Sequence, residues 1–360
     1  MKHMYIHIPF CSHICSYCDF CKMFKNDKMI DNYLDALKKE IDEYYNYEEM
    51  ETVYIGGGTP SCLNSKQLDK LFSILSIVRI KEDYEYTFEC NPCDINEELI
   101  DILVKNKVNR LSIGIESFDI DNLGFMERKV EFKDIQYKIN MIRNKGINNI
   151  NLDLIYGIPE ENIKTLKKDL LLLVKLKPNH ISTYSLQIEK HTKIYNEGIN
   201  PINEELDSKM YFTIINYLKK HKYNHYEISN FALKGYESRH NLSYWNNEEY
   251  YGFGLGSSGY IDGFRYDNTR NLSRYMSGDY HLNESLLSLD DKMYDEVMLG
   301  LRKMKGINLK EFENKYGVKF EDKYDIDSLI KNKELIIKDG YVFISPKYLY
   351  LINEILIKIL

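Results

Sequence analysis

The sequence predicts an α/β protein: a partial (β/α)6 barrel of the TIM type, followed by a smaller, mainly helical, winged-helix-like domain. Three observations support this prediction. Short β-rich runs alternate with amphipathic helices over the first half of the 360 residues. Polar motifs directly follow several of the expected strands, as they do at the active face of a barrel. From Asp290 onward, helices and a β-hairpin replace the alternation.

The barrel is predicted from six apolar strand candidates: residues 4–8, 52–55, 84–90, 110–115, 149–156 and 180–186. Apolar residues recur between them at helical spacing, in residues 30–45, 68–75 and 163–174. Strands in βα alternation form a parallel sheet with right-handed crossovers. Because six units are fewer than the eight that close a TIM barrel, we expect a partial barrel whose active face lies at the carboxyl ends of the strands.

The rest of the chain is predicted to form a closing segment and an appendage. After a helix over residues 204–222, residues 223–285 are expected to form a short strand and loops that close the open side of the barrel. The winged-helix-like pattern consists of helices near 290–304, 309–316 and 326–331, a hairpin of 335–337 and 341–344, and a last helix from Lys347. We therefore divide the chain into residues 1–222, 223–285 and 286–360.

Composition restricts the classes of function. The 48 basic and 55 acidic residues give a net charge of −7, so nucleic acid is not an expected partner, because binding to a phosphate backbone requires a basic face. The start, MKHMYIHIPFC, contains no export signal, and no window approaches the about 18 uncharged apolar residues of a membrane span. Seven cysteines in such a chain are typical of reduced thiols. We therefore expect a cytoplasmic protein.

Cys11, Cys15 and Cys18 form a C-x3-C-x2-C run on one short loop after the first strand candidate. Soft thiolate ligands select iron–sulfur clusters or zinc. A 4Fe-4S cluster held by three cysteines leaves one iron open for a further ligand, whereas a structural site closes its coordination sphere. The alternatives are unligated cysteines or a zinc site completed by a fourth residue, which would be His7, His13 or Cys21.

The run HIPFCSHICSYCDF, with an aromatic residue before the third cysteine, resembles the radical S-adenosylmethionine (SAM) superfamily. In that superfamily, the open iron of the cluster binds the amino and carboxylate groups of SAM. Later segments narrow the resemblance to the branch that contains oxygen-independent coproporphyrinogen III oxidase and the HemW-like heme chaperones. The resemblance covers nearly the whole chain and implies a 4Fe-4S cluster on Cys11, Cys15 and Cys18, with SAM on its unique iron.

The resemblance also implies which residues bind SAM. A Gly-Gly-Gly-Thr-Pro run follows the second strand, where glycine allows the backbone to approach a ligand, although a tight turn alone would also require it. Buried charge within an apolar strand, as at Asp153, is costly in a core. The residues assigned to the SAM site by resemblance are Tyr5, Tyr17, Gly57, Gly58, Thr59, Glu89, Glu116, Arg128 and Asp153.

Three of these positions have open alternatives or depart from the family. Glu116 stands where the family usually has glutamine, so a neutral donor and acceptor becomes an acceptor-only carboxylate. Glu89 would otherwise be an ordinary solvated acid at a strand end, and Arg128 a surface arginine, although an arginine can pair with a carboxylate in a bidentate manner. Elsewhere, Lys129 replaces a frequent histidine. The remaining thiols are interpreted as incidental: Cys62, Cys90 and Cys93.

Residues 226–245 contain the string HNLSYW, with His240, Asn241, Tyr244 and the chain's only tryptophan. Imidazole is a common axial ligand of heme iron, and aromatic side chains stack on flat rings. The string resembles the mark of HemW-like heme chaperones, which the true oxidases lack. We therefore expect His240 to bind heme, a solvated loop histidine being the alternative. In the following GFGLGSSGY run, Ser258 stands where a histidine is common.

The sequence thus favours a heme chaperone that binds a 4Fe-4S cluster, SAM and heme. Its expected partners are acceptor hemoproteins, with membrane-bound respiratory enzymes as candidates, and a reductant such as flavodoxin or ferredoxin. The alternatives are a coproporphyrinogen III oxidase that decarboxylates two propionates and a radical SAM methyltransferase that opens heme. Against the oxidase stand the short stretch before the cysteines, the HNLSYW string, Glu116, and Cys21 at C-x2-C spacing from Cys18. No catalytic residue is assigned.

Overall fold

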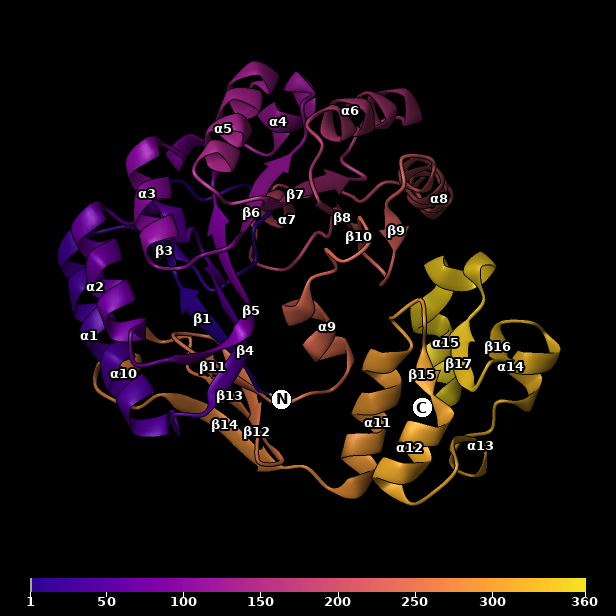
Figure 1. Ribbon diagram of the computed structural model, residues 1–360. Coiled ribbons are helices and arrows are strands. Elements are labelled where there is room, and N and C mark those ends of the chain that lie inside the picture. The colour runs from indigo at the N-terminus through magenta and orange to yellow at the C-terminus, as the bar shows by residue number, and fades with distance from the viewer. Residues whose placement is uncertain (1) are drawn as a thin grey trace.

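The six expected barrel strands lie side by side and in parallel at the centre of one large sheet. The computed structural model describes residues 2–360, and within them this sheet has the order β14-β13-β12-β11-β1-β4-β5-β6-β7-β8-β10-β9. The barrel strands are β1 (Lys2–Ile8), β4 (Glu49–Gly57), β5 (Arg79–Cys90), β6 (Arg110–Glu116), β7 (Asn149–Tyr156) and β8 (His180–Ser185). Figure 1 shows these strands curving into an open barrel with helices outside, which confirms the predicted fold class.

Amphipathic helices cover the outer face of the barrel. They are α1 (Asp27–Tyr44), α2 (Ser65–Leu75), α3 (Glu97–Lys105), α5 (Phe132–Asn144), α6 (Ile163–Lys175) and α8 (Glu204–Lys220), with the shorter α4 (Ile120–Phe125) and α7 (Lys193–Asn196). Several begin at an asparagine whose side chain accepts a backbone N–H of the first turn: Asn26, Asn64, Asn96, Asn162 and Asn203. Such caps fix where each helix starts. The inner stripes of the six longer helices and the sheet share one hydrophobic core, whereas α4 and α7 contribute Leu123 and Ile194 to a second, smaller cluster.

Residues 223–285 extend the sheet at both edges, so the expectation of one short strand and loops is wrong. Two short strands, β9 (Asn224–His225) and β10 (Asn230–Ala232), add to β8. At the other edge, β11 (Tyr250–Phe253) pairs in parallel with β1 and leads into an antiparallel group. That group is β12 (Ser258–Ile261), β13 (Phe264–Asn268) and β14 (His281–Leu286), with α10 (Leu272–Met276) between the last two.

Helix α9 (Arg239–Trp245) lies across the open side of the barrel, between these two additions to the sheet (Figure 1). It contains the HNLSYW string, which was expected to be a loop. Ser238 caps the helix by accepting the N–H of Asn241. Seven residues span only about two helical turns, too few for a periodic pattern to show in the sequence.

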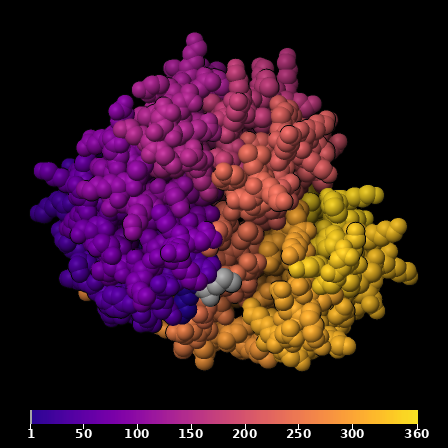
Figure 2. All heavy atoms as spheres, viewed as in Figure 1, coloured from indigo at the N-terminus to yellow at the C-terminus, as the bar shows by residue number. Residues whose placement is uncertain are grey.

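The C-terminal region forms a lobe beside the barrel (Figures 1 and 2). Its elements are α11 (Leu289–Gly300), β15 (Ile307–Asn308), α12 (Leu309–Tyr316), α13 (Phe320–Lys323), α14 (Asp327–Lys331), β16 (Leu335–Lys338), β17 (Tyr341–Ile344) and α15 (Ile352–Ile359), the last preceded by a 3-10 helix over Pro346–Leu351. The expected helices and hairpin lie where they were predicted. Two elements were not predicted: α13, and the strand β15, which pairs with β17 as a third strand. Among the helices of residues 2–360, none has the length and apolar character needed to cross a membrane.

Candidate functional site

A cavity of about 420 Å³ opens at the carboxyl ends of the barrel strands, a volume typical of small-molecule sites. Nearly all the residues assigned to the cluster and SAM line it: Cys11, Cys15, Tyr17, Cys18, Gly57, Gly58, Thr59, Glu89, Glu116, Arg128 and Asp153. Tyr5 and His240 lie outside this lining. Polar strand residues that the sequence analysis did not select line it too: Tyr54, Arg110, Ser112, Asn151 and Ser182. The interior of a closed barrel is packed with aliphatic side chains. The polar interior of this barrel therefore indicates a ligand-binding site.

Two of the three cysteines are contacted by different elements of the fold. Cys11 ends the short strand β2 (Phe10–Cys11), which pairs with β3 (Met23–Phe24) and closes the loop between them. The Thr59 hydroxyl donates to Cys11 Sγ over 3.3 Å, and Arg128 Nη1 donates to Cys15 Sγ over 3.4 Å. Burial raises the pKa of the Cys11 thiol to about 11. Because metals bind thiolates, cluster insertion must displace this proton, and iron supplies the compensating charge.

The surroundings of Cys21 and His7 do not suit a closed zinc site. His7 uses both ring nitrogens, Nδ1 with the Tyr5 hydroxyl at 3.0 Å and Nε2 with the Cys21 carbonyl at 2.7 Å. Cys21 lies outside the cavity, beside Gly256. His13 lines the cavity, yet no three His, Cys, Asp or Glu side chains within residues 2–360 converge as a single ion requires. A cluster does not need that convergence, because each thiolate binds a different iron.

The other three thiols are separate from one another. All seven cysteines are free within the described chain. Cys62 is buried and its Sγ donates to the Phe10 carbonyl over 3.4 Å, whereas Cys90 is buried and Cys93 is exposed. Their interpretation as incidental thiols stays a prediction.

The glycine run brings the backbone of β4 against the cysteine loop. Gly57 has a φ of +116°, and a Cβ added there would lie 2.7 Å from the His7 ring. A Cβ at Gly58 would lie 2.9 Å from the Phe10 carbonyl oxygen and 3.0 Å from Cys11 Sγ. Such contacts are closer than van der Waals packing permits, so close approach as well as turn geometry requires glycine.

Glu89 is a half-buried acid with both oxygens fixed, not a solvated residue at a strand end. The Tyr54 hydroxyl donates to Oε1 over 2.6 Å, and the Gly57 N–H donates to Oε2 over 3.1 Å. Burial raises the pKa of Glu89 to about 7, although both hydrogen bonds favour the charged form. A carboxylate kept in this state is positioned to accept hydrogen bonds from a polar or cationic ligand.

Glu116 and Arg128 both face the cavity and form a long ion pair. Arg128 Nη1 lies 3.9 Å from Glu116 Oε1, and its Nη2 donates to the Gly114 carbonyl. Burial raises the pKa of Glu116 even though the guanidinium lies close. Glu116 also has a φ of +67° at a register shift between β6 and β7. Left-handed backbone in a non-glycine residue stores strain and is concentrated at functional sites.

Asp153 is held by one residue of its own strand and by one residue of the neighbouring strand β6. Asn151 Nδ2 donates to its Oδ1 over 2.8 Å, and the Ser112 hydroxyl donates to its Oδ2 over 3.3 Å. Burial raises the pKa of this carboxyl. Sequence reasoning found Asp153 as a charge in an apolar strand but missed Asn151, whose signal was the period-two alternation of polar residues along β7.

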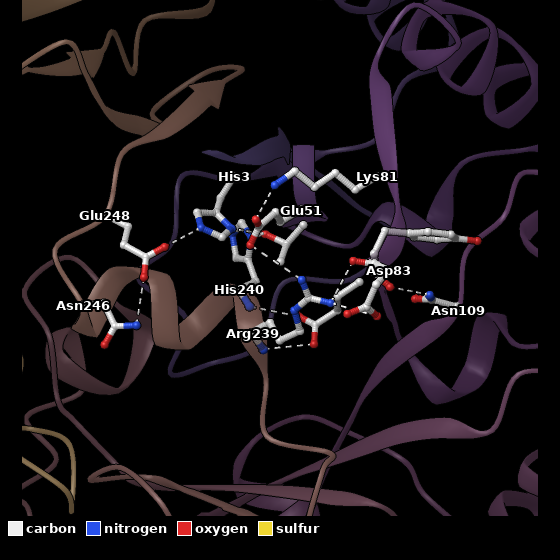
Figure 3. Close-up of polar contacts among 12 residues, drawn as sticks. His3, Glu51, Lys81, Asp83, Asn109, Arg239, His240, Asn246 and Glu248 are labelled. Atoms are coloured by element: carbon white, nitrogen blue, oxygen red, sulfur yellow. Dashed lines mark hydrogen bonds and ion pairs between the residues drawn. The ribbon is translucent and has the colours of Figure 1, made fainter. Parts of the chain in front are cut away.

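His240 is buried in α9, so the expectation of an accessible loop imidazole is wrong. Its side chain is about 1% exposed, with Nδ1 2.6 Å from Thr52 Oγ1 and Nε2 2.8 Å from the Tyr244 hydroxyl. Figure 3 shows His240 beside His3 within a network that extends to Glu248. Iron can reach Nε2 only after the Tyr244 hydroxyl moves away. The role of His240 as heme ligand stays a prediction.

Comparisons with known proteins agree with this geometry. Residues 5–173 match the family model of the radical SAM superfamily, and residues 287–351 match that of the HemN C-terminal domain. The chain is 38% identical to the heme chaperone HemW of Lactococcus lactis, covering 99% of this chain and 96% of that protein. It is 36% identical to HemW of Bacillus subtilis, covering 98% and 96%. Over 99% of its length it superposes, with a TM-score of 0.88 and 22% identity, on 89% of coproporphyrinogen III oxidase from Escherichia coli.

The fold and the family match are those of a radical SAM protein, the class whose cofactors are a 4Fe-4S cluster and SAM. At 22% identity, the match to the oxidase establishes the fold alone. Identity to the chaperones extends over nearly the full length of both sequences. The chain therefore belongs to the HemW family.

Proposed function

We propose that this chain is a heme chaperone that binds a 4Fe-4S cluster, SAM and heme and transfers heme to acceptor hemoproteins. The observation that supports the cofactor site is the cavity itself, which is lined by three cysteines, a glycine turn and three acids that are buried or half-buried. Similarity over nearly the whole chain to proteins named heme chaperone HemW supports the role toward heme.

In this proposal, Cys11, Cys15 and Cys18 hold the cluster and leave one iron for SAM. Cluster and SAM together supply one-electron chemistry when bound. The chain's own residues bind SAM and orient it. Glu89 and Asp153 are fixed acceptors for hydroxyl and ammonium groups, and Arg128 is a mostly buried donor for a carboxylate. Their burial excludes water, which strengthens each of these contacts.

The partners and location follow from the same assignment. Cluster reduction requires a one-electron donor of low potential, for which we propose flavodoxin or ferredoxin. The proposed heme acceptors include membrane-bound respiratory enzymes. Seven free cysteines in the described chain support a cytoplasmic location. The division into residues 1–222, 223–285 and 286–360 is also proposed, and the separate family match of residues 287–351 supports its last boundary.

The test uses anaerobically reconstituted full-length protein. We expect heme to bind with a shifted Soret band, and we expect no protoporphyrinogen from coproporphyrinogen with SAM and reductant present. Formation of protoporphyrinogen would assign the chain to the oxidases, and an opened tetrapyrrole would assign it to the methyltransferases. A Soret band that stays at the position of free heme when protein is in excess would contradict the chaperone role.

A further inference from the structure

Residues 226–245, which lie between β9 and β11 and include α9, line the cavity of the SAM site through Asn241 and contact its acids through two buried histidines. Neither His180 nor His240 lines the cavity. Each one nevertheless stands between a tyrosine of residues 226–245 and a strand residue of the barrel. The first path leads to Asp153 and the second to Glu89.

The path to Asp153 consists of hydrogen bonds alone. The Tyr226 hydroxyl lies 2.7 Å from His180 Nε2, and His180 Nδ1 lies 2.6 Å from Asn151 Oδ1. Asn151 Nδ2 then donates to Asp153 Oδ1 over 2.8 Å. The Ser182 hydroxyl, 3.1 Å from Asn151 Oδ1, donates to the same amide oxygen.

The protonation of His180 sets the direction of this path. Burial lowers the pKa of His180 well below its ordinary value, so the ring is neutral and has one N–H and one lone pair. If Tyr226 donates to Nε2, the N–H is on Nδ1 and donates to the Asn151 oxygen. The amide of Asn151 must then present its NH2 group to Asp153. Without this bond, only the Ser182 hydroxyl donates to the amide oxygen, so the orientation that presents the NH2 group to Asp153 is held more weakly.

The path to Glu89 combines a stacked ring with a hydrogen bond. The His240 and Tyr54 rings stack with centroids 5.0 Å apart and planes 28° from parallel. The Tyr54 hydroxyl donates to Glu89 Oε1 over 2.6 Å. Thr52 and Tyr244 occupy the two nitrogens of His240, so the ring that supports Tyr54 cannot rotate without losing a bond.

Residues 226–245 are themselves anchored on two sides. Glu85 accepts the backbone N–H groups of Arg239 and His240 at the start of α9, each over 3.0 Å. The Arg239 guanidinium reaches Glu51 and Asp83 on β4 and β5 (Figure 3). On the other side, the Met304 N–H donates to the Tyr226 carbonyl over 3.0 Å, which ties the segment to the C-terminal lobe.

We infer that residues 226–245 are a positioning element for SAM, in which His180 orients Asp153 through Asn151 and His240 orients Glu89 through Tyr54. This inference rests on the proposed function, because it takes the two acids as SAM ligands. It gives the HNLSYW string a role in the SAM site that does not require heme. His180 and His240 are positioning residues, since neither touches the cavity.

The experiment measures the dissociation constant of SAM in cluster-loaded, full-length protein, from the change in the EPR spectrum of the reduced cluster. Tyr226→Phe removes one hydroxyl and should weaken SAM binding about three- to tenfold, the worth of about one hydrogen bond. His180→Leu should weaken it at least as much. His180→Asn keeps an N–H donor at the position of Nδ1 and should bind SAM nearly as the unaltered protein does.

His225→Leu is the matched control, because His225 is a half-buried histidine of β9 that hydrogen-bonds to the Ile228 carbonyl and stacks on Phe231, and neither of these residues belongs to the two paths. It should leave SAM binding unchanged at equal iron content. Asp153→Asn is the positive control and should weaken binding. The g-values of the SAM-bound cluster should shift in Tyr226→Phe and not in His225→Leu, which a general loss of stability would not produce.

The outcomes separate the inference from the proposed function. If the unaltered protein shows no change in its EPR spectrum with SAM, the proposed function fails. Suppose instead that the unaltered protein responds to SAM and that Asp153→Asn weakens binding. If Tyr226→Phe then binds SAM as tightly as the unaltered protein, the inference is overturned and the proposed function is not. The inference is also overturned if Asp153→Asn has no effect, or if His180→Asn weakens binding as much as His180→Leu. If His180→Leu does not retain its cluster, the SAM dissociation constant of Tyr226→Phe alone tests the inference.

Discussion

Glu89→Gln should stabilise the cluster-free protein at neutral pH while weakening its binding of SAM once the cluster is present. Burial raises the pKa of Glu89 from 4.5 to about 7. That difference corresponds to about 3 kcal/mol of folding free energy. Because the folded state retains the proton longer, Glu89 lowers stability progressively as the pH rises from 4.5 to about 7, and the loss is constant above that.

Glutamine removes this cost but loses one acceptor. Its single carbonyl oxygen can accept from Tyr54 or Gly57 and not from both, which costs about 1 kcal/mol. Urea unfolding should therefore show Glu89→Gln to be about 1 kcal/mol less stable than the unaltered protein at pH 4 and about 2 kcal/mol more stable at pH 8. SAM binding should weaken about tenfold, because a hydrogen bond to a charged acceptor is lost.

Glu82→Gln, on an exposed part of the same strand, is the control and should leave the free energy of unfolding unchanged at both pH values. A Glu89→Gln variant that is less stable at pH 8 would refute the reasoning, because Glu89 would then not be a carboxylate held against a desolvation cost. Residues of a binding site are expected to lower the stability of the folded protein in return for function, and Glu89 fits this expectation.

Three further predictions concern the cysteine loop, the heme ligand and the strained strand end. Gly58→Ala should lower the iron content of reconstituted protein, since its Cβ would lie 3.0 Å from Cys11 Sγ, whereas Gly124→Ala, whose Cβ meets nothing within 4 Å, should not; equal iron in both would contradict the close approach. If His240 ligates heme, His240→Ala should weaken the Soret shift and Tyr244→Phe, which frees Nε2, should tighten heme binding; an unchanged spectrum in both excludes the ligand role. Glu116→Gly should be about 1 kcal/mol more stable than Glu116→Ala, because both variants lose the carboxylate that faces Arg128 and only glycine relieves the φ of +67°; equal free energies of unfolding in the two variants would count against strain there.

The sequence was informative where a residue's role depends on its immediate neighbours in the chain. Apolar runs predicted the six parallel strands, and the spacing of Cys11, Cys15 and Cys18 predicted that their loop lines the site. Glu89 was found because it ends a strand. In each case the signal lies within one element or one loop.

Supporting residues were missed because their partners are distant in sequence. His180 contacts Asn151 and Tyr226, which lie 29 and 46 residues away, and an alternating strand pattern does not say which polar residues meet across a barrel. Strand β11 pairs with β1 although His3 and its partner Tyr250 are far apart in the sequence, which no local pattern indicates. His240 was expected to be accessible because α9 is too short to show a helical period, and only the structure reveals Thr52 and Tyr244 at its two nitrogens.

The most direct test of the account is whether three cysteines hold a cluster whose open iron takes SAM. Iron content and the EPR spectrum of the dithionite-reduced protein, with and without SAM, should be measured for the unaltered chain, Cys15→Ala and Cys21→Ala. We predict about four irons per chain and a SAM-dependent spectrum in the unaltered chain and in Cys21→Ala, and loss of both in Cys15→Ala. Stoichiometric zinc without iron–sulfur absorbance, or a spectrum unchanged at saturating SAM, would contradict the account.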